Sequence, residues 1–117
     1  MATEADSDCL FCKILVGEIP ADVVYETPTT LAFRDVSPQA PTHVLVIPRS
    51  HQPDVATLAA KEPDTAVDLL NAVAAVADQE GLESYRLVFN TGAQAQQTVF
   101  HVHAHVIGGR PMNWPPG

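Results

Sequence analysis

Hydrophobic residues recur along the chain with two different spacings, and these spacings predict where helices and strands form. Residues 9–17 carry apolar side chains at helical spacing and end at a glycine, which predicts one short helix. Residues 64–80 carry small apolar side chains at the same spacing and are followed by Gly81, which predicts one long helix. The face of the long helix expected to be buried consists of Ala66, Val67, Leu70, Val73, Ala74 and Ala77.

Short runs of β-branched and aromatic residues between turn signals predict the strands. Residues 23–25 and 31–33 flank a Thr-Pro-Thr-Thr turn and are predicted to form a hairpin, and residues 43–47 form a strand that stops at a proline. Two further strands are predicted at residues 85–89 and 98–107. The order of helices and strands favours an α+β fold with a largely antiparallel, five-stranded sheet.

Composition and charge restrict the class of protein. The chain has 117 residues, 46% of them hydrophobic and 17% charged, which is typical of one globular domain. We expect this domain at residues 9–117, after a flexible acidic tail at residues 1–8. The longest apolar runs fall far short of the roughly 18 residues of a membrane span. No signal peptide is recognisable, so we expect a cytoplasmic protein without membrane association.

The charge pattern bears on the partners of the protein. The formal net charge is −8, and the six lysines and arginines are scattered along the sequence. A protein that follows a nucleic-acid backbone needs a basic cluster, so we expect no nucleic-acid partner. A small anionic ligand stays possible, because such a ligand needs only a few local donors.

The segment from residue 100 to residue 106 carries a histidine at every second position. Since side chains alternate across a strand, His101, His103 and His105 are predicted to share one face. Neutral imidazole serves as a metal ligand, a nucleophile or a general acid–base, and the pattern leaves all three roles open. The opposite face, which should pack on the core, carries Phe100, Val102, Ala104 and Val106.

Cys9 and Cys12 form a C-x-x-C motif at the start of the first predicted helix. In a reducing compartment such a pair indicates half of a metal site or a redox pair before a structural disulfide. A Cys₂His₂ zinc site needs two further nitrogens, and five histidines are available, including His43 and His51 near the third strand. The alternatives are two buried reduced cysteines without a metal, or a redox pair, which lacks its usual βαβ surroundings.

These motifs resemble those of the histidine-triad (HIT) superfamily. Its sequence His-φ-His-φ-His-φ-φ, where φ is apolar, is matched at residues 101–107. Residues 33–48 resemble the nucleotide-pocket segment of the Hint branch, and residues 108–117, which end in Trp114-Pro-Pro-Gly117, resemble its C-terminal tail. The resemblance extends over about residues 9–117. It implies a HIT-like fold in which two protomers join into a homodimer with one ten-stranded sheet.

The resemblance to Hint proteins, which are purine nucleoside phosphoramidases, also implies an activity. The enzyme would cleave the phosphorus–nitrogen bond of adenosine or other purine nucleoside 5′-phosphoramidates and release AMP or GMP. His103 would attack phosphorus and form a nucleotidyl-histidine intermediate, which water resolves. The other implied catalytic residues are His43, His105 and Thr98. The implied nucleotide-binding residues are Phe11, Ile14, Phe33, Asp35, Val36, Asn90, Gln97 and Trp114.

Bacterial HIT proteins often keep the C-x-x-C motif, and the resemblance to them implies a structural zinc ion and no organic cofactor. The implied zinc ligands are Cys9, Cys12, His51 and His101, which leaves His103 and His105 at the phosphate. One position departs from the Hint pattern. Gln96 stands where many Hint proteins have glycine, which would keep that backbone N–H farther from the phosphate.

Other hypotheses compete with the phosphoramidase. The three triad histidines could together bind a catalytic metal, in which case replacing His103 would release that metal. The chain could instead be a purine-nucleotide-binding or scaffolding module with vestigial hydrolysis, which would bind AMP tightly without turnover. A Fhit-like dinucleotide hydrolase is a same-class alternative that the Trp114-Pro-Pro-Gly117 ending disfavours.

Overall fold

The computed structural model describes residues 8–117, so the predicted flexible tail lies outside the described residues apart from Asp8. The described chain contains one antiparallel sheet of five strands in the order β1-β2-β3-β5-β4. This arrangement confirms the predicted α+β fold. The strands are β1 (Val23–Glu26), β2 (Thr30–Arg34), β3 (Thr42–Pro48), β4 (Tyr85–Val88) and β5 (Ala104–Gly108).

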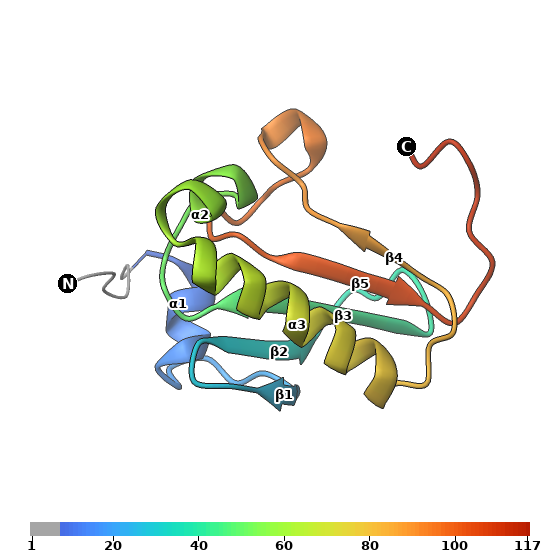
Figure 1. Cartoon of the computed structure of the whole chain (residues 1–117), viewed down its shortest axis with the longest axis horizontal. Coiled ribbons are helices and arrows are strands. Elements are labelled where there is room, and N and C mark those ends of the chain that lie inside the picture. Colours follow the sequence, from blue (N-terminus) through green and yellow to red (C-terminus); the bar gives the residue numbers. More distant parts are fainter. Residues whose placement is uncertain (1–7) are drawn as a thin grey trace.

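The long helix α3 (Pro63–Gln79) lies across one face of the sheet (Figure 1). Its proline occupies the first turn, where no backbone N–H is needed. The predicted buried face was wrong in part, because Val67, Leu70 and Ala74 are exposed. The helix is apolar on more than one side, and helical spacing alone does not tell which side meets the sheet. The buried residues are Leu69, Ala72, Val73, Val76 and Ala77.

A second helix on this side, α2 (Val55–Lys61), was not predicted from the sequence. Its N-cap is Asp54, whose carboxylate accepts a hydrogen bond from the Thr57 N–H at 2.9 Å. Only Leu58 of this helix is fully buried, so its seven residues do not show the repeated spacing of apolar positions that predicts a helix. None of the helices among residues 8–117 is long and apolar enough to cross a bilayer.

The last predicted strand is shorter than expected, since only Ala104–Gly108 joins the sheet. Before it, the Val102 N–H donates to the Gln52 carbonyl oxygen at 2.8 Å instead of to a neighbouring strand. Phe100 is 52% exposed, so its predicted place in the core was wrong. As a consequence His101 and His103 precede the strand, and the three triad histidines do not share one strand face.

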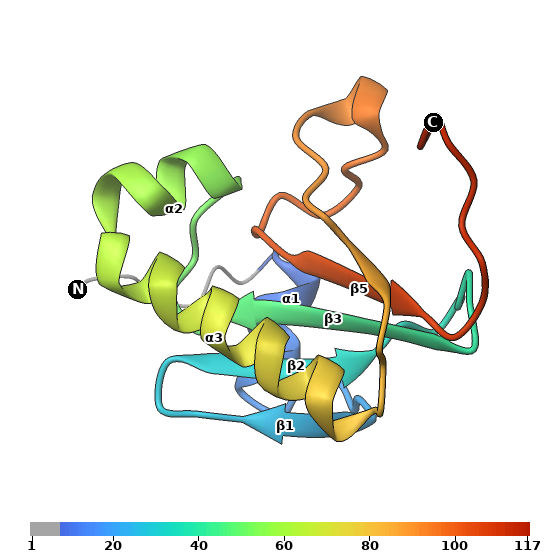
Figure 2. The same ribbon diagram turned by 45° about the vertical axis from the view of Figure 1, so that its right-hand side comes forward.

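The opposite face of the sheet carries the short helix α1 (Leu10–Leu15), which lies behind the strands in Figure 2. Phe11 and Cys12 of this helix are buried against side chains from β2 and β3. Gly17 ends the helical segment with a positive φ of 82°, as the glycine in the sequence predicted. The strand residues in this second core cluster are Leu31, Phe33, Leu45 and Ile47.

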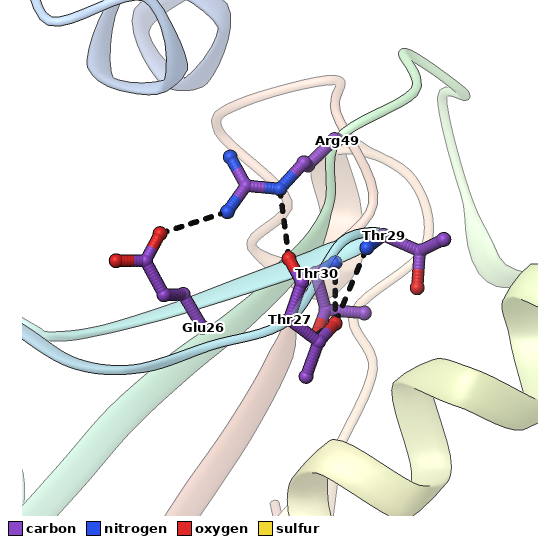
Figure 3. A network of polar contacts seen from close by, with 5 residues as sticks. All are labelled: Glu26, Thr27, Thr29, Thr30 and Arg49. Carbon is purple, nitrogen blue, oxygen red and sulfur yellow. Dashed lines mark hydrogen bonds and ion pairs between the residues drawn. The ribbon is translucent and has the colours of Figure 1, made fainter.

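A polar network ties the β1–β2 turn to the end of β3 (Figure 3). The Thr27 hydroxyl accepts hydrogen bonds from the Thr29 and Thr30 N–H groups, which closes the turn. The Arg49 guanidinium donates to the Thr27 carbonyl and to the Glu26 carboxylate, each at 3.0 Å. Because Arg49 directly follows β3, this network fixes the direction in which the chain continues to His51.

Candidate active site and metal centre

Two cysteines and two histidines converge at the start of α1. Cys9 is the N-cap of the helix and Cys12 lies one turn later, so both Sγ atoms lie on the same side. Their ligand atoms and those of His51 and His101 all lie within 4.8 Å of one another. The Sγ–Nδ1 distances are 3.5 Å from Cys9 to His101, 3.5 Å from Cys12 to His101 and 3.3 Å from Cys12 to His51.

This donor set fits a tetrahedral zinc ion. Zinc bonds of about 2.3 Å to sulfur and about 2.0 Å to nitrogen separate the two ligands by about 3.5 Å. The His101 Nε2–H donates to the Pro48 carbonyl oxygen at 2.9 Å, so the lone pair of its Nδ1 faces the cysteines. A backbone carbonyl that holds the second nitrogen of a ligating histidine is the usual arrangement around a bound metal. The cluster can therefore hold a four-coordinate ion.

The ring of His103 turns away from this cluster. Its Nδ1 donates to the backbone carbonyl oxygen of His101 at 2.8 Å, so Nδ1 carries the proton in the neutral ring. The Nε2 atom then has the lone pair, and it forms no hydrogen bond with the described residues. The ring also contacts the edge of Phe11, with ring centroids 5.0 Å apart. His103 thus presents an unprotonated nitrogen.

His105 presents the opposite group, and His43 explains why. The Gln39 N–H donates to Nδ1 of His43, so the proton of the neutral His43 ring lies on Nε2. That Nε2–H donates to Nδ1 of His105 at 2.9 Å, which leaves the His105 proton on Nε2. The His105 Nε2 atom is buried and has no hydrogen-bond partner among the described residues. A donor is therefore held ready beside the lone pair of His103.

Burial keeps these rings neutral. Burial lowers the pKa of His105 to about 4, and repulsion from His103 and His43 adds to the shift. Burial also lowers the pKa of His43, although the Asp35 carboxylate, 3.4 Å from its Nε2, opposes that shift. The pKa of His103 is lowered by burial against the opposing effect of its hydrogen bond to the His101 carbonyl. At neutral pH a neutral imidazole can act as a nucleophile through its unprotonated nitrogen and as a hydrogen-bond donor through its N–H.

A cavity of about 690 Å³ opens beside these rings. One wall is apolar and comes from α1, β2 and β3, with Phe11 packed edge-on against Phe33 at 5.5 Å between centroids. Asp35 lies at the rim, where its second carboxylate oxygen accepts the Ser37 N–H at 2.8 Å. The predicted site residues that line this cavity are Phe11, Ile14, Phe33, Asp35, Val36, Thr98, His103 and His105. His43 stands behind them, 5% exposed.

Three predicted nucleotide-binding residues do not line the cavity. Gln97 is 3% exposed, and its carboxamide is engaged with the Gly92 N–H and with the Pro53 and Val99 carbonyls. Asn90 follows β4 and is half-buried outside the lining. Trp114 is 81% exposed on the C-terminal tail, with the Arg86 guanidinium 6.0 Å from its ring centroid.

Sequence reasoning missed two charged residues of the lining. Arg34 on β2 and Asp22 before β1 both border the cavity. The Arg34 guanidinium forms a bidentate pair with Glu80, at 3.0 and 3.1 Å, and lies 3.8 Å from Asp22. The feature of the sequence that could have indicated Arg34 as a cavity residue is its position directly before Asp35, the expected ribose-binding residue.

The triad histidines do not converge on one metal. His101 joins the cysteines, whereas His105 joins His43 and Asp35 in a separate group. The fold and these two clusters define a small α+β protein with a histidine-centred candidate site next to a Cys₂His₂ cluster.

Comparison with known proteins assigns the chain to a family. The chain belongs to the HIT domain family, which matches residues 16–112, and the predicted resemblance is thereby confirmed. A HIT family hydrolase from Legionella pneumophila has a solved structure that superposes with a TM-score of 0.89 at 48% identity. That alignment covers 93% of this chain and 99% of the Legionella chain.

Three relatives carry informative names. The chain is 49% identical to the 14 kDa zinc-binding protein of Zea mays, over 96% of this chain and 90% of that protein. It is 47% identical to adenylylsulfatase HINT1 of Arabidopsis thaliana, over 99% and 81% of the respective chains. It is 42% identical to the purine nucleoside phosphoramidase of Escherichia coli strain K12, over 90% of each.

Proposed function

We propose that the protein hydrolyses the phosphorus–nitrogen bond of purine nucleoside 5′-phosphoramidates through a nucleotidyl-histidine. The observation that carries this function is the pair of opposed tautomers at one cavity. His103 presents a lone pair on Nε2, and His105 presents an N–H on Nε2. Nucleophilic displacement of an amine needs one of each.

The reaction follows from these two groups. The His103 Nε2 attacks the α-phosphorus of the phosphoramidate protonated at its nitrogen, and the phosphorus–nitrogen bond breaks. The amine departs neutral, and the His105 Nε2–H donates a hydrogen bond to the lone pair that the amine regains. Water then attacks the same phosphorus, and the bond from phosphorus to His103 Nε2 breaks. The proton that water loses is taken up by the released amine, which leaves a neutral His103 and the nucleoside monophosphate. His43 would hold the tautomer of His105 through both steps, and the hydroxyl of Thr98, which lines the cavity, would donate to the phosphoryl oxygens.

The cavity supports a purine nucleoside as the rest of the substrate. A purine would lie against Phe11, Ile14 and Phe33, with Val36 at the open side. The Asp35 carboxylate would accept hydrogen bonds from the ribose hydroxyls, as acidic residues do in other nucleotide pockets. Gln97 has a structural role in this proposal. Its carboxamide is already hydrogen-bonded within the loop and therefore does not bind the phosphate.

The Cys₂His₂ cluster is assigned to a structural zinc ion. All four coordination positions come from the protein, which leaves none for substrate or water. The ion would fasten α1 to the residues that precede β5. The ion would also help to hold the Phe11 ring in position, because this ring contacts both His101 and His103, at 5.9 and 5.0 Å between centroids.

A homodimer completes the proposed enzyme. Within residues 8–117, β4 is an edge strand that pairs only with β5, and an unpaired edge favours association. Val67 and Leu70 on α3 and Tyr85 on β4 are 57%, 50% and 41% exposed. Pairing of two β4 strands about a two-fold axis would cover these side chains and extend the sheet to ten strands. A sedimentation mass of one chain at micromolar concentration would refute the dimer.

The C-terminal tail is proposed to reach the partner subunit beside its leaving-group side. In the single chain, the tail leaves the end of β5 and extends away from the sheet (Figure 1). Deletion of residues 114–117 should therefore change the preference among amine leaving groups more than it changes AMP affinity. Equal effects on all substrates would assign the tail a purely structural role.

The decisive experiment is a turnover assay with adenosine 5′-phosphoramidate, read as AMP release. Adenylyl sulfate is assayed beside it, because the same attack on an adenylyl phosphorus would expel sulfate. Intact-mass analysis during turnover should find a nucleotidyl adduct that is absent from His103→Ala. Tight AMP binding without turnover of either compound would instead support the nucleotide-binding module.

A further inference from the structure

Gln96 has a left-handed backbone conformation that the described chain otherwise gives to glycine. Its φ is 72° and its ψ is 26°, and among residues 8–117 it is the only non-glycine residue with positive φ. A Cβ atom in this conformation crowds the following carbonyl, so glycine would be the more stable residue here. The other positive-φ positions are occupied by Gly17, Gly81, Gly92 and Gly109.

The backbone at this turn does not require a glutamine. Gln96 caps the short 3₁₀ helix Ala93–Ala95, and its N–H donates to the Ala93 carbonyl at 3.0 Å. The next N–H, that of Gln97, donates to the Gly92 carbonyl at 3.1 Å. Both hydrogen bonds would form equally with glycine at position 96. The side chain must therefore account for the residue that stands there.

The two consecutive glutamines differ in what their side chains contact. Gln97 is buried, and its carboxamide holds the loop together through three hydrogen bonds. Gln96 is exposed, forms no side-chain hydrogen bond with the described residues, and lines the cavity beside Thr98, His103 and His105. Gln97 thus fixes the loop, while the carboxamide of Gln96 stays available to a ligand.

The charge of the cavity explains why a neutral donor is useful there. Arg34 is the one lysine or arginine that lines the cavity within the described part of the chain. Its guanidinium is already paired with Glu80 and lies near Asp22. A phosphoryl group must therefore be held mainly by uncharged N–H and O–H groups. A carboxamide supplies two N–H donors without adding charge.

We propose that Gln96 is a phosphoryl-binding residue whose Nε2 donates to a non-bridging phosphoryl oxygen of the nucleotide. The identity of this ligand rests on the proposed function. Negative charge on these oxygens grows as His103 attacks phosphorus, so the same hydrogen bond stabilises the transition state more than the bound substrate. The strained turn is retained because a glycine would lack this donor.

The test compares AMP with adenosine, which lacks the phosphoryl group, on the full-length protein by titration calorimetry. In Gln96→Gly the Kd for AMP should rise about tenfold, as expected for one lost hydrogen bond to a charged group, while the Kd for adenosine stays unchanged. Gln96→Glu should weaken AMP binding further through charge repulsion. Gln94→Gly, an exposed position of the same 3₁₀ helix outside the cavity lining, should leave both affinities unchanged.

Stability provides an independent measurement. Gln96→Gly should melt a few degrees higher than the wild type, because it relieves the left-handed strain. A lower melting temperature would mean that Gln96 is kept for stability, and would overturn the proposal. Unchanged AMP affinity, or equal losses of AMP and adenosine affinity, would also overturn it.

Turnover separates this proposal from the proposed function. If the wild type hydrolyses no phosphoramidate, the proposed function fails, while the AMP and adenosine titrations still decide on Gln96. If the wild type is active, kcat/KM of Gln96→Gly should fall at least as far as its AMP affinity. A wild-type kcat/KM in Gln96→Gly would overturn the role of Gln96 and leave the phosphoramidase assignment intact.

Discussion

The two faces of the sheet are built from the same strands but differ in chemistry. On β3, Val44 and Val46 pack in the core cluster under α3. On the other face, Leu45 packs in the cluster with α1 and lines the cavity, and His43 is hydrogen-bonded to the cavity residue His105. Side chains alternate along a strand, so each strand supplies both faces at once. A buried imidazole needs a partner, and the α1 side provides partners in Asp35, a second imidazole and backbone carbonyls.

The difference lies in how completely each face is covered. The 17-residue helix α3 and the neighbouring α2 close one face with apolar side chains. The six-residue helix α1 closes only part of the other face, and the remaining space is the cavity. The sealed face therefore stabilises the fold, while the open face carries the reactive groups. Variants of the cavity histidines and of the apolar core under α3 should accordingly affect different measurable quantities.

The largest effect is expected from His103→Ala on the open face. Loss of the proposed nucleophile should lower the rate of AMP release by about 10⁴-fold or more, because the proposed displacement begins with attack by its Nε2. The melting temperature should change little, because His103 lies outside the apolar core under α3. Activity within tenfold of the wild type would remove His103 as the nucleophile.

The metal centre is expected to give the next largest effect. Cys12→Ser removes one of four ligands, and a structural zinc ion contributes on the order of several kcal/mol to folding. Elemental analysis of protein purified without chelator should find about one zinc ion per chain in the wild type and less in the variant. AMP affinity should fall with it, because α1 carries Phe11.

Chelation of the wild-type protein is the control for the metal centre. Removal of zinc should lower the melting temperature, and added zinc should restore it. A metal-free wild type that melts at the same temperature with and without chelator would exclude the zinc ion. That outcome would leave the histidine chemistry of the open face unaffected.

The Leu69→Ala variant tests how much the sealed face contributes to stability. Leu69 is 1% exposed in α3, and its truncation should lower the free energy of unfolding by about 2–5 kcal/mol through the cavity that it leaves. The kcat for AMP release, measured well below the melting temperature, should stay at the wild-type value. A large fall in kcat with an intact fold would show that the two faces are coupled.

The sequence predicted the sealed face and the open face to different extents. The strands and the long helix followed from hydrophobic spacing. Apolar side chains recur at every second residue in a half-buried strand and about every 3.6 residues in an amphipathic helix. The buried side of α3 did not follow, since Val67, Leu70 and Ala74 are as apolar as the residues that pack inward. Only tertiary contacts with the sheet select between such faces.

The candidate site was predictable as a set of residues but not as an arrangement. The C-x-x-C motif and the alternating histidines indicated reactive groups, and the resemblance to a family divided them between metal and phosphate. The tautomers of His103 and His105 depend on a backbone carbonyl and on the Gln39 N–H, which no side-chain pattern encodes. The left-handed turn at Gln96 likewise depends on backbone hydrogen bonds that the sequence alone does not reveal.

The smallest expected effect is the pH dependence of stability, and it should belong to the open face alone. The pKa of His105 is about 4 in the folded protein, against an ordinary value of 6.5, so between these values the unfolded chain binds more protons. Stability from the neutral ring is therefore complete above pH 6.5 and is lost as the pH falls toward 4. His105 is partly solvated, so screening reduces this contribution to about 1 kcal/mol.

His105→Gln should flatten the fall in unfolding free energy between pH 6.5 and 5, measured by urea titration, whereas the curve of Leu69→Ala should run parallel to that of the wild type. All three proteins share the metal centre, so its acid lability cancels in the differences. A His105→Gln curve parallel to the wild type would mean that the imidazole is not held neutral by its surroundings.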